Sequence, residues 1–515
     1  MSGIGEQGTE SVGRAELLIA LSLAIDLGLG LPMETMQRAA LLAQRLAGSA
    51  GLPADEVAAA YYLALLRFVG CTVSSHGDSI LFGDELGAAA LMTADDPEML
   101  GTVRRSIGPG EATHTRALMF GRAVVFAMSG QMAQQHRMHC EAAALIAQRL
   151  DMPAVVESAL AHTYERWDGR GTPSGLGGEA ISRPMRVVHV AMLASILART
   201  MPAAAVADAV RARGGRQLDP TLAEAFAANT GELLADLDAA DLPALVMAAE
   251  PPAPRFAGDS FDRALEAIAD FGDLKTPHML GHSRRVAALA GDAASRAGLP
   301  AADIALVRRA GLVHDIGRVG VPEKLWVKTG PLTAAEHERI RLHTYLTERV
   351  FATTPALAAI GRIGGGHHER LDGSGYHRGT AAGLQPAAMR ALAAANAWCA
   401  LTEARPHRPT FTADEAARHL AAEARAGRLD VNAVEAVLSA AGIQPQRRRA
   451  PGIGLSEREI EVLRLLAGQQ SNKAIGKTLG ISPKTVERHV THIYDKIGAT
   501  TRAGAALYAT DKGLI

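Results

Sequence analysis

Spaced histidines mark residues 275–430 as the part of the sequence best equipped for chemistry. Five of the histidines in this range, together with one aspartate, form a candidate ligand set: His282, His314, Asp315, His343, His367 and His368. A lone histidine is more often a core or surface residue, but an ordered set of neutral imidazoles with a carboxylate suits Fe, Mn or Zn. Two such ions ~3.5–4 Å apart clamp a phosphate ester and lower the pKa of a bound water. The set predicts one or two divalent transition-metal ions.

Helices are expected to position these ligands. Aromatic residues are 4% of the chain and hydrophobic residues 48%, so the cores rest on Ala, Leu, Val and Ile. This composition favours packed helices over sheets, and we predict an all-α fold. His282 is expected to open one helix and His343 to lie on a helix that starts after Thr333. His314 follows a third apolar helix, which Gly317 is expected to end.

The length and two breaks in the pattern predict three domains. At roughly 150 residues per domain, 515 residues suggest about three. Residues 250–260 are rich in Pro and Gly, and residues 444–454 form a second, basic linker. We therefore predict a helical module over 14–249, a metal-binding module over 261–443 and a small tail domain over 455–515.

An internal repeat relates the first two modules. Residues 165–171 align with residues 369–375 at an offset of 204, whereas Arg38 meets Arg285 at an offset of 247. The first copy therefore holds 43 extra residues between its halves, within 71–138.

The first copy has lost the ligand set. Five of the six ligand positions fall on Thr35, Arg67, Phe68, Thr163 and Tyr164, and only His139 remains, opposite His343. One imidazole cannot hold two ions. We predict that this degenerate module serves packing, dimerisation or ligand sensing.

Residues 275–430 resemble the HD-GYP subgroup of the HD metal-dependent phosphohydrolases. The resemblance rests on His282-Ser283-x-Arg285, His314-Asp315-Ile316-Gly317, Val321-Pro322 through Lys328, His343, and His367-His368-Glu369-x-x-Asp372-Gly373-x-Gly375-Tyr376. Family members with this pattern hydrolyse cyclic di-GMP at a di- or tri-metal centre. The resemblance implies that all six residues of the set bind metal. It also implies that Asp315 and Lys328 are catalytic, with Lys328 near phosphate.

The sequence departs from the family at the last ligand. The family has an aspartate where this chain has Asn396, and an amide oxygen is a neutral, weaker ligand. We expect Asn396 still to bind, with one ion held less tightly. Cys399, one turn further on, replaces a second aspartate; it is interpreted as an apolar filler, with a soft metal ligand as the alternative. The family's HD-box lysine is Arg318 here.

The tail has the basic charge and the helix-capping residues expected of a DNA-binding domain. Residues 447–515 hold twelve Lys and Arg against six Asp and Glu, on an otherwise acidic chain. A capping box at Ser456 and an N-cap at Ser482 predict helices, the latter running to about Ile497. A short helix, a tight turn and a longer basic helix suit a DNA major groove, although a three-helix interaction bundle is the alternative.

The tail also resembles the LuxR-type DNA-binding domain from Leu455 to Gly498. The resemblance implies that Lys484, Thr485 and Arg488 face double-stranded DNA and that the last helix forms a homodimer. Backbone N–H groups at Ser482 are placed to meet phosphate, and His492 lies away from the apolar stripe of the same helix.

Cysteine use and hydropathy bear on the compartment. The three cysteines lie far apart without a CxxC pair, which favours a reducing compartment. The first sixteen residues lack a basic region followed by an apolar run. No apolar stretch reaches ~18–20 residues. We expect a cytoplasmic protein without a membrane span.

Three hypotheses for function remain. The leading one is a LuxR-type transcriptional regulator whose DNA binding is controlled by HD-like modules that bind metal and a phosphorylated or cyclic nucleotide. The alternative is an active metal phosphodiesterase of the cyclic di-GMP type, with the tail as an accessory. The third is that both modules are inert scaffolds. Because Asn396 is not an aspartate, enzymatic activity is left open.

Overall fold

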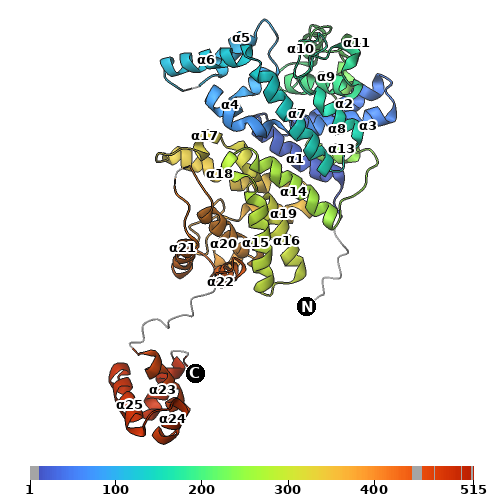
Figure 1. The fold of residues 1–515 in the computed structure, drawn as a ribbon. Helices are drawn as coiled ribbons and strands as arrows, with labels where there is room; N and C mark the ends of the chain where they lie inside the picture. The colour runs from blue at the N-terminus through green and yellow to red at the C-terminus, as the bar shows by residue number, and fades with distance from the viewer. Residues whose placement is uncertain are drawn as a thin grey trace. The chain divides into compact units, whose positions relative to one another are not determined.

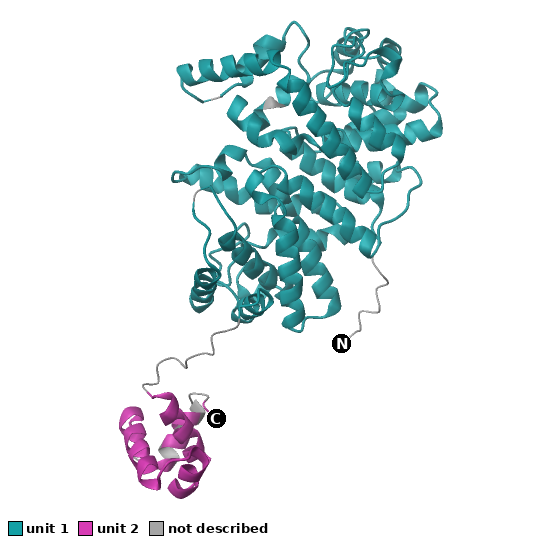
Figure 2. Ribbon diagram, viewed as in Figure 1, with its two compact units in different colours: residues 1–443 teal, residues 444–515 magenta. Residues whose placement is uncertain are grey.

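The computed structural model describes residues 11–108, 110–406, 408–443, 455–468, 470–499, 501–511 and 514. Within these ranges every regular element is a helix, accompanied by three isolated β-bridges (Figure 1). The all-α prediction is confirmed. The chain forms two compact units, residues 1–443 and 444–515 (Figure 2). The predicted basic linker, 444–454, lies outside the described residues.

The described residues in the first half of unit 1 form thirteen α-helices and four 3₁₀ turns. They are α1 (Arg14–Gly28), α2 (Thr35–Ser49), α3 (Ala54–Leu66), η1 (Cys71–Ser74), α4 (Ser75–Phe82), η2 (Glu85–Met92), α5 (Met99–Ser106), α6 (Thr113–Met128), α7 (Gln131–Arg149), α8 (Ala154–Ala159), η3 (Leu160–His162), η4 (Gly178–Ala180), α9 (Arg183–Leu197), α10 (Ala203–Arg211), α11 (Pro220–Ala228), α12 (Thr230–Leu233) and α13 (Leu242–Ala248). The helices α4 to α6 occupy the stretch in which the repeat predicts extra residues.

Where the structure describes the second half of unit 1, it has nine α-helices and three 3₁₀ turns. They are α14 (Asp259–Asp273), η5 (Pro277–Met279), α15 (His282–Arg296), α16 (Ala301–Val313), η6 (Ile316–Gly320), α17 (Glu323–Trp326), α18 (Ala334–Phe351), α19 (Pro355–Gly365), η7 (Ala382–Leu384), α20 (Ala387–Thr402), α21 (Ala413–Arg425) and α22 (Val431–Ala440).

The helices repeat at the offsets found in the sequence. The bounds of α2 and α15 differ by 247 residues at both ends, as do those of α3 and α16, and α9 and α20 begin 204 residues apart. Buried aspartates at equivalent positions cap the paired helices. Asp26 accepts the backbone N–H of Thr35 at 2.9 Å, and Asp273 accepts that of Ser283 at 3.0 Å.

The glycine-rich loop is held in the same way in both copies. Glu369 is buried and accepts the backbone N–H groups of the residues nine and eleven positions later, Arg378 and Thr380, at 2.8 and 2.6 Å. Glu165 in the first copy accepts those at the same two spacings, at 2.8 and 2.9 Å. The loop scaffold is therefore retained where the ligand set is lost.

Gly317 does not end a helix, contrary to expectation. α16 ends at Val313, and Gly317 lies inside η6. A Cβ at Gly317 would overlap the carbonyl oxygen of His343, because η6 packs its backbone directly against α18. Gly70, at the equivalent position of the first copy, makes the same approach to His139.

The two halves of unit 1 share one hydrophobic core. A single cluster of buried apolar residues runs from Val12 to Val437, with α1 packed against both η6 and α18. Residues 54–82 form a helical stretch long enough to cross a membrane, and its most apolar window of 18 residues has a mean hydropathy of 1.5. Of its most apolar window, 72% is buried inside the structure, as in a core helix.

Four helices lie in the part of the tail unit that the structure describes: α23 (Glu457–Ala467), α24 (Asn472–Leu479), α25 (Pro483–Ile497) and α26 (Arg502–Asp511). The capping box predicted at Ser456 is present, since its hydroxyl accepts the N–H of Glu459 and the Glu459 carboxylate accepts that of Ser456. The Ser482 hydroxyl caps α25 by accepting the N–H of Thr485 at 3.1 Å. Val486 and Ile493 on α25 are buried in the core of this unit.

Candidate metal centre

Five segments of unit 1 bring the predicted ligands together. His282 is the first residue of α15, His314 and Asp315 follow α16, and His343 lies on α18. The remaining members are His367 and His368, directly after α19, and Asn396 on α20. Their ligand atoms form two clusters that could each hold an ion: His282, His314 and Asp315, and His343, His367 and His368.

The two carboxylate oxygens of Asp315 face different histidines. Oδ2 lies 3.8 Å from His282 Nε2 and 3.6 Å from His314 Nε2. Oδ1 lies 3.6 Å from His343 Nε2 and 3.5 Å from His367 Nε2. Two ligand atoms that share one ion at bonds of about 2.1 Å are about 3.0–3.4 Å apart. The observed spacings are slightly wider than this, and each oxygen faces a different pair of histidines, so Asp315 could act as a ligand to two ions.

The imidazoles present lone pairs to this space. The Nδ1–H groups of His314, His343 and His367 donate to the backbone carbonyls three residues earlier, at 2.8, 2.6 and 2.7 Å. Each Nε2 therefore carries a lone pair that points toward Asp315. His314 Nε2 is buried without a hydrogen-bond partner, and the Nε2 atoms of His343 and His367 lie 3.2 Å apart. A donor set of this kind fits a metal cation.

Burial also fixes the charge states that metal binding needs. It lowers the pKa of His343 to about 4 and holds the pKa values of His314, His367 and His368 below their ordinary range. Burial alone would raise the pKa of Asp315, but the surrounding imidazoles and the Arg318 guanidinium hold it well below its usual value. At neutral pH the site thus offers neutral imidazoles and an ionised carboxylate.

Asn396 and His368 complete the two ends of the site. Asn396 is buried, and its Oδ1 lies 3.2 Å from His282 Nε2, on the side of the first cluster. The His368 ring stacks on Tyr376, with centroids 4.7 Å apart.

A cavity of about 230 Å³ opens onto the ligands. Its lining includes Arg318, Arg405, Arg408, Trp326 and Tyr376 together with several members of the ligand set. The Arg318 guanidinium lies 3.7 Å from the centroid of the Trp326 ring, and its Nη1 lies 3.4 Å from Asp315 Oδ2. The cavity thus combines a predicted metal site with guanidinium groups suited to phosphate.

Lys328 is not brought into this cavity. Its ammonium donates to both carboxylate oxygens of Glu336, at 2.9 and 2.7 Å, at the start of α18. Among the described side chains, the guanidinium of Arg318 lies beside the carboxylate of Asp315 instead. The predicted catalytic role of Lys328 stays a prediction.

Sequence reasoning missed Glu403, which follows α20. Its Oε2 accepts the Nδ1–H of His282 at 2.7 Å, and its Oε1 accepts Arg285 Nε at 2.7 Å. Glu403 lies seven residues after Asn396, a spacing that returns to the same helix face. That spacing was the one available signal, because His282 is distant in the sequence.

The first module fills the equivalent space with hydrogen bonds. His139 Nε2 lies 2.7 Å from the Ser74 hydroxyl, and its Nδ1 lies 2.9 Å from the Tyr164 hydroxyl. Tyr164 in turn contacts the Cys71 thiol at 2.9 Å. Burial lowers the pKa of His139 to about 3. The remaining histidine is therefore tied into a polar network among described side chains.

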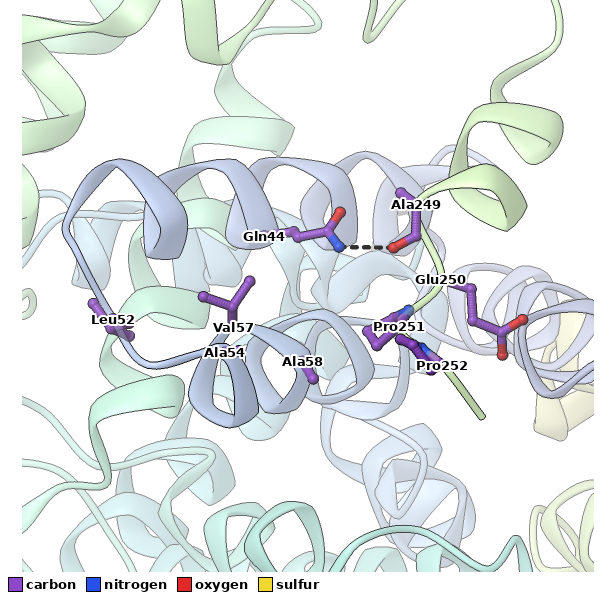
Figure 3. A pocket seen from close by; sticks show the side chains of 9 residues that line it. All are labelled: Gln44, Leu52, Ala54, Val57, Ala58, Ala249, Glu250, Pro251 and Pro252. Carbon is purple, nitrogen blue, oxygen red and sulfur yellow. Dashed lines mark hydrogen bonds between the residues drawn. The ribbon is translucent and has the colours of Figure 1, made fainter. Parts of the chain in front are cut away.

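A second hollow, of about 510 Å³, lies beside the first linker (Figure 3). Gln44 donates to the carbonyl oxygen of Ala249 across it, at 2.7 Å, as Figure 3 shows. Its acidic lining residue, Glu250, accepts the N–H of Ala15. The remaining lining is mostly Ala, Pro, Leu and Val, so this hollow carries no set of groups for catalysis.

The tail presents the predicted DNA-facing residues on one helix. Lys484, Thr485, Arg488 and His492 are exposed on α25, and Ser482 is exposed at its start. Five of the first six residues from Ser482 are exposed, with buried Val486 facing the core. The exposed side therefore carries the basic groups.

Two parts of the chain match known families. Residues 266–433 match the HD domain, and residues 454–509 match the bacterial regulatory proteins of the luxR family. The chain joins an HD domain to a LuxR-type domain. The HD domain contains every predicted metal ligand, and the LuxR-type domain contains every predicted DNA-facing residue.

Curated relatives resemble both parts. A 3′3′-cGAMP-specific phosphodiesterase of Vibrio cholerae is 27% identical over 412 residues, covering 78% of this chain and 89% of the relative. A cyclic di-GMP phosphodiesterase of Thermotoga maritima is 32% identical over 167 residues, which span 32% of this chain and 44% of the relative. The regulatory protein MctR of Rhizobium johnstonii is 43% identical over 61 residues, 12% of this chain and 28% of its own length.

A solved structure shares the fold of most of the chain. It is that of a cyclic GMP-AMP-specific phosphodiesterase of V. cholerae, with a TM-score of 0.59 and 24% identity. The likeness covers 85% of this chain and 99% of the other. The alignment is therefore longer than the HD domain and includes helices of the first module.

Proposed function

We propose that residues 261–443 form a metal-dependent phosphodiesterase that hydrolyses a cyclic dinucleotide. The observation that carries the proposal is the position of Asp315, whose two oxygens face separate histidine clusters inside a cavity lined by three arginines. Several relatives are cyclic-dinucleotide phosphodiesterases, which favours this alternative over the leading hypothesis of a LuxR-type regulator whose DNA binding is controlled by HD-like modules.

Some residues of this chain would bind the metal ions, and others would orient the substrate. A pair of divalent transition-metal ions, when bound, would stabilise charge on the phosphate and provide a nucleophile at neutral pH. His282, His314 and Asn396 would hold one ion, His343, His367 and His368 the other, and Asp315 both. Arg318 and Arg405 would orient the phosphodiester through charged hydrogen bonds.

The tail adds a second activity to the proposal. Lys484, Thr485 and Arg488 are exposed on α25, and the family of this domain is that of luxR-type regulatory proteins. We propose that the tail binds double-stranded DNA as a homodimer in the cytoplasm. One chain would then both hydrolyse a cyclic dinucleotide and bind DNA.

One preparation tests the enzyme proposal. The full chain is purified without oxygen and without added metal, and metal per chain is measured beside Asp315→Ala and the control Asp292→Ala, a surface aspartate. We expect about two ions per chain in the wild type and the control, none in Asp315→Ala, and turnover of a cyclic dinucleotide that follows metal content. A chain loaded with Mn or Fe that hydrolyses neither cyclic di-GMP nor 3′3′-cGAMP would contradict the proposal.

A further inference from the structure

His282 is oriented differently from the other histidines of the site. His314, His343 and His367 each donate Nδ1–H to a carbonyl three residues earlier. His282 is the first residue of α15, so no preceding turn of that helix supplies a carbonyl. Its Nδ1–H donates instead to the carboxylate of Glu403, which α20 delivers from 121 residues away.

Glu403 is itself held in place. Its side chain is 13% exposed, and that of His282 is 1% exposed. Arg285 Nε donates to Oε1 at 2.7 Å, and Arg405 Nη2 lies 3.5 Å from Oε2. These contacts hold the carboxylate in place, so that it can set the orientation of the imidazole.

The same imidazole lies beside the neutral ligand. His282 Nε2 lies 3.2 Å from Asn396 Oδ1, where a carboxylate would have added a negative charge to the first cluster. A carboxylate that accepts the N–H of a ligating histidine makes that imidazole a stronger donor to a metal. Glu403 stands in this relation to His282, on the cluster that includes Asn396.

We propose that Glu403 is a positioning residue for the first metal site. It fixes the tautomer and ring orientation of His282 and supplies, through that imidazole, the negative charge that Asn396 does not bring. The inference rests on the proposed metal centre. The charge that Glu403 supplies is expected to affect one ion only, because one oxygen of Asp315 faces His282 and the other faces His343 and His367.

For the test, the full chain is first stripped of the metal that co-purifies with it. Its affinity for Mn²⁺ is then measured from the electron paramagnetic resonance signal of the Mn²⁺ that stays free. We expect Glu403→Gln to weaken one of two ions by about 10–100-fold and to leave the other unchanged. Glu403→Asp, which keeps the charge on a shorter side chain, should weaken the same ion less. Glu423→Gln, which removes a carboxylate paired with Arg428 outside the cavity, is the matched control.

The decisive variant restores the charge directly. In Asn396→Asp, the further change Glu403→Gln should weaken the first ion by less than it does in the wild type, because the new carboxylate carries the charge. Equal affinity of Glu403→Gln and the wild type for both ions would overturn the proposal, as would equal weakening of both ions. A wild-type chain that binds no Mn²⁺ would instead contradict the proposed metal centre. If Glu403→Gln does not fold, Glu403→Asp takes its place. Weaker binding of one ion, with the other unchanged, is again the expected result, and equal affinity for both ions would again overturn the proposal.

Discussion

Glu85 of the first module and Lys275 of the second form an ion pair of 2.8 Å, with side chains that are 4% and 1% exposed. The Glu85 carboxylate also accepts the backbone N–H of Glu323 at the start of α17, and Lys275 Nζ donates to the carbonyl of Val319 in η6. The last residue of α17, Trp326, lines the cavity. The pair thus links the degenerate module to the wall of the candidate site.

Loss of one partner should destabilise unit 1. We expect Lys275→Met to lower the free energy of unfolding by about 3–5 kcal/mol, because Glu85 is left as a buried, unpaired charge. The double variant with Glu85→Gln should lose less than the sum of the two single variants. Urea unfolding measures both. Glu338→Gln, from an exposed pair on α18, is the control and should change stability by less than about 0.5 kcal/mol.

Removal of the bridging carboxylate should empty both metal sites together. In Asp315→Ala the histidines of both clusters lose the carboxylate oxygen that faces them, whereas His367→Ala removes a member of the second cluster alone. Elemental analysis should find no ion in Asp315→Ala and about one in His367→Ala. One ion retained in Asp315→Ala would show that the carboxylate serves a single site.

The Arg318 guanidinium should contribute to substrate binding. Arg318→Ala removes a cation that lies beside Asp315 in the cavity, and a charged hydrogen bond contributes about 1.5–3 kcal/mol. We expect KM for the cyclic dinucleotide to rise about tenfold or more with metal content unchanged, and Arg318→Lys to show a smaller rise. An unchanged KM in Arg318→Ala would exclude the contact.

Acid should weaken the tail through Glu459. Burial opposes ionisation of this carboxyl, but the hydrogen bonds from Lys496, the shorter at 2.7 Å, and the capping box lower its pKa to about 2. Because this pKa lies below the unfolded value of about 4.3, the stabilisation is complete above about pH 5 and is lost as the pH falls toward 2.

Glu459→Gln should therefore lower the unfolding free energy of peptide 444–515 by about 1–2 kcal/mol at pH 7, since Lys496 is partly exposed and its pairing is screened. The difference from the wild type should shrink toward pH 2. Urea unfolding followed by circular dichroism measures it. The exposed Glu457→Gln serves as control, and a difference that does not change with pH would contradict the assignment.

Arg488 should contribute to DNA affinity and to its salt dependence. If its exposed guanidinium contacts phosphate, Arg488→Ala lowers affinity for double-stranded DNA and reduces the slope of log K against log salt by about 1. Fluorescence anisotropy of the full chain over a salt series measures both. Arg458→Ala is a control on α23, where the guanidinium pairs with Glu461. Unchanged binding in Arg488→Ala would exclude this face of α25.

Local features of the fold could be predicted from the sequence. The starts of α15 at His282 and of α18 after Thr333 follow from periodicity and a capping residue, and so do the caps of the tail helices at Ser456 and Ser482. Each signal lies within a few residues of the feature it predicts.

Long-range contacts could not be predicted in the same way. The role of Gly317 depends on the approach of η6 to α18, and the role of Glu403 depends on a histidine far away in the chain. The pairing of Glu85 with Lys275 crosses between the two modules. No periodicity or capping pattern specifies such partners, because they are set by how the helices pack.

The loop clamp shared by Glu165 and Glu369 has a consequence for folding. The first module keeps this clamp and the same helix pairs, although its sequence lacks the imidazoles for a pair of ions. The fold of this module is thus stabilised by helix packing and by hydrogen bonds to the backbone. A zinc finger, in contrast, needs its ion to fold. Protein stripped of metal should therefore keep its fold, so that loss of metal would end the proposed hydrolysis without unfolding the chain and exposing it to proteolysis.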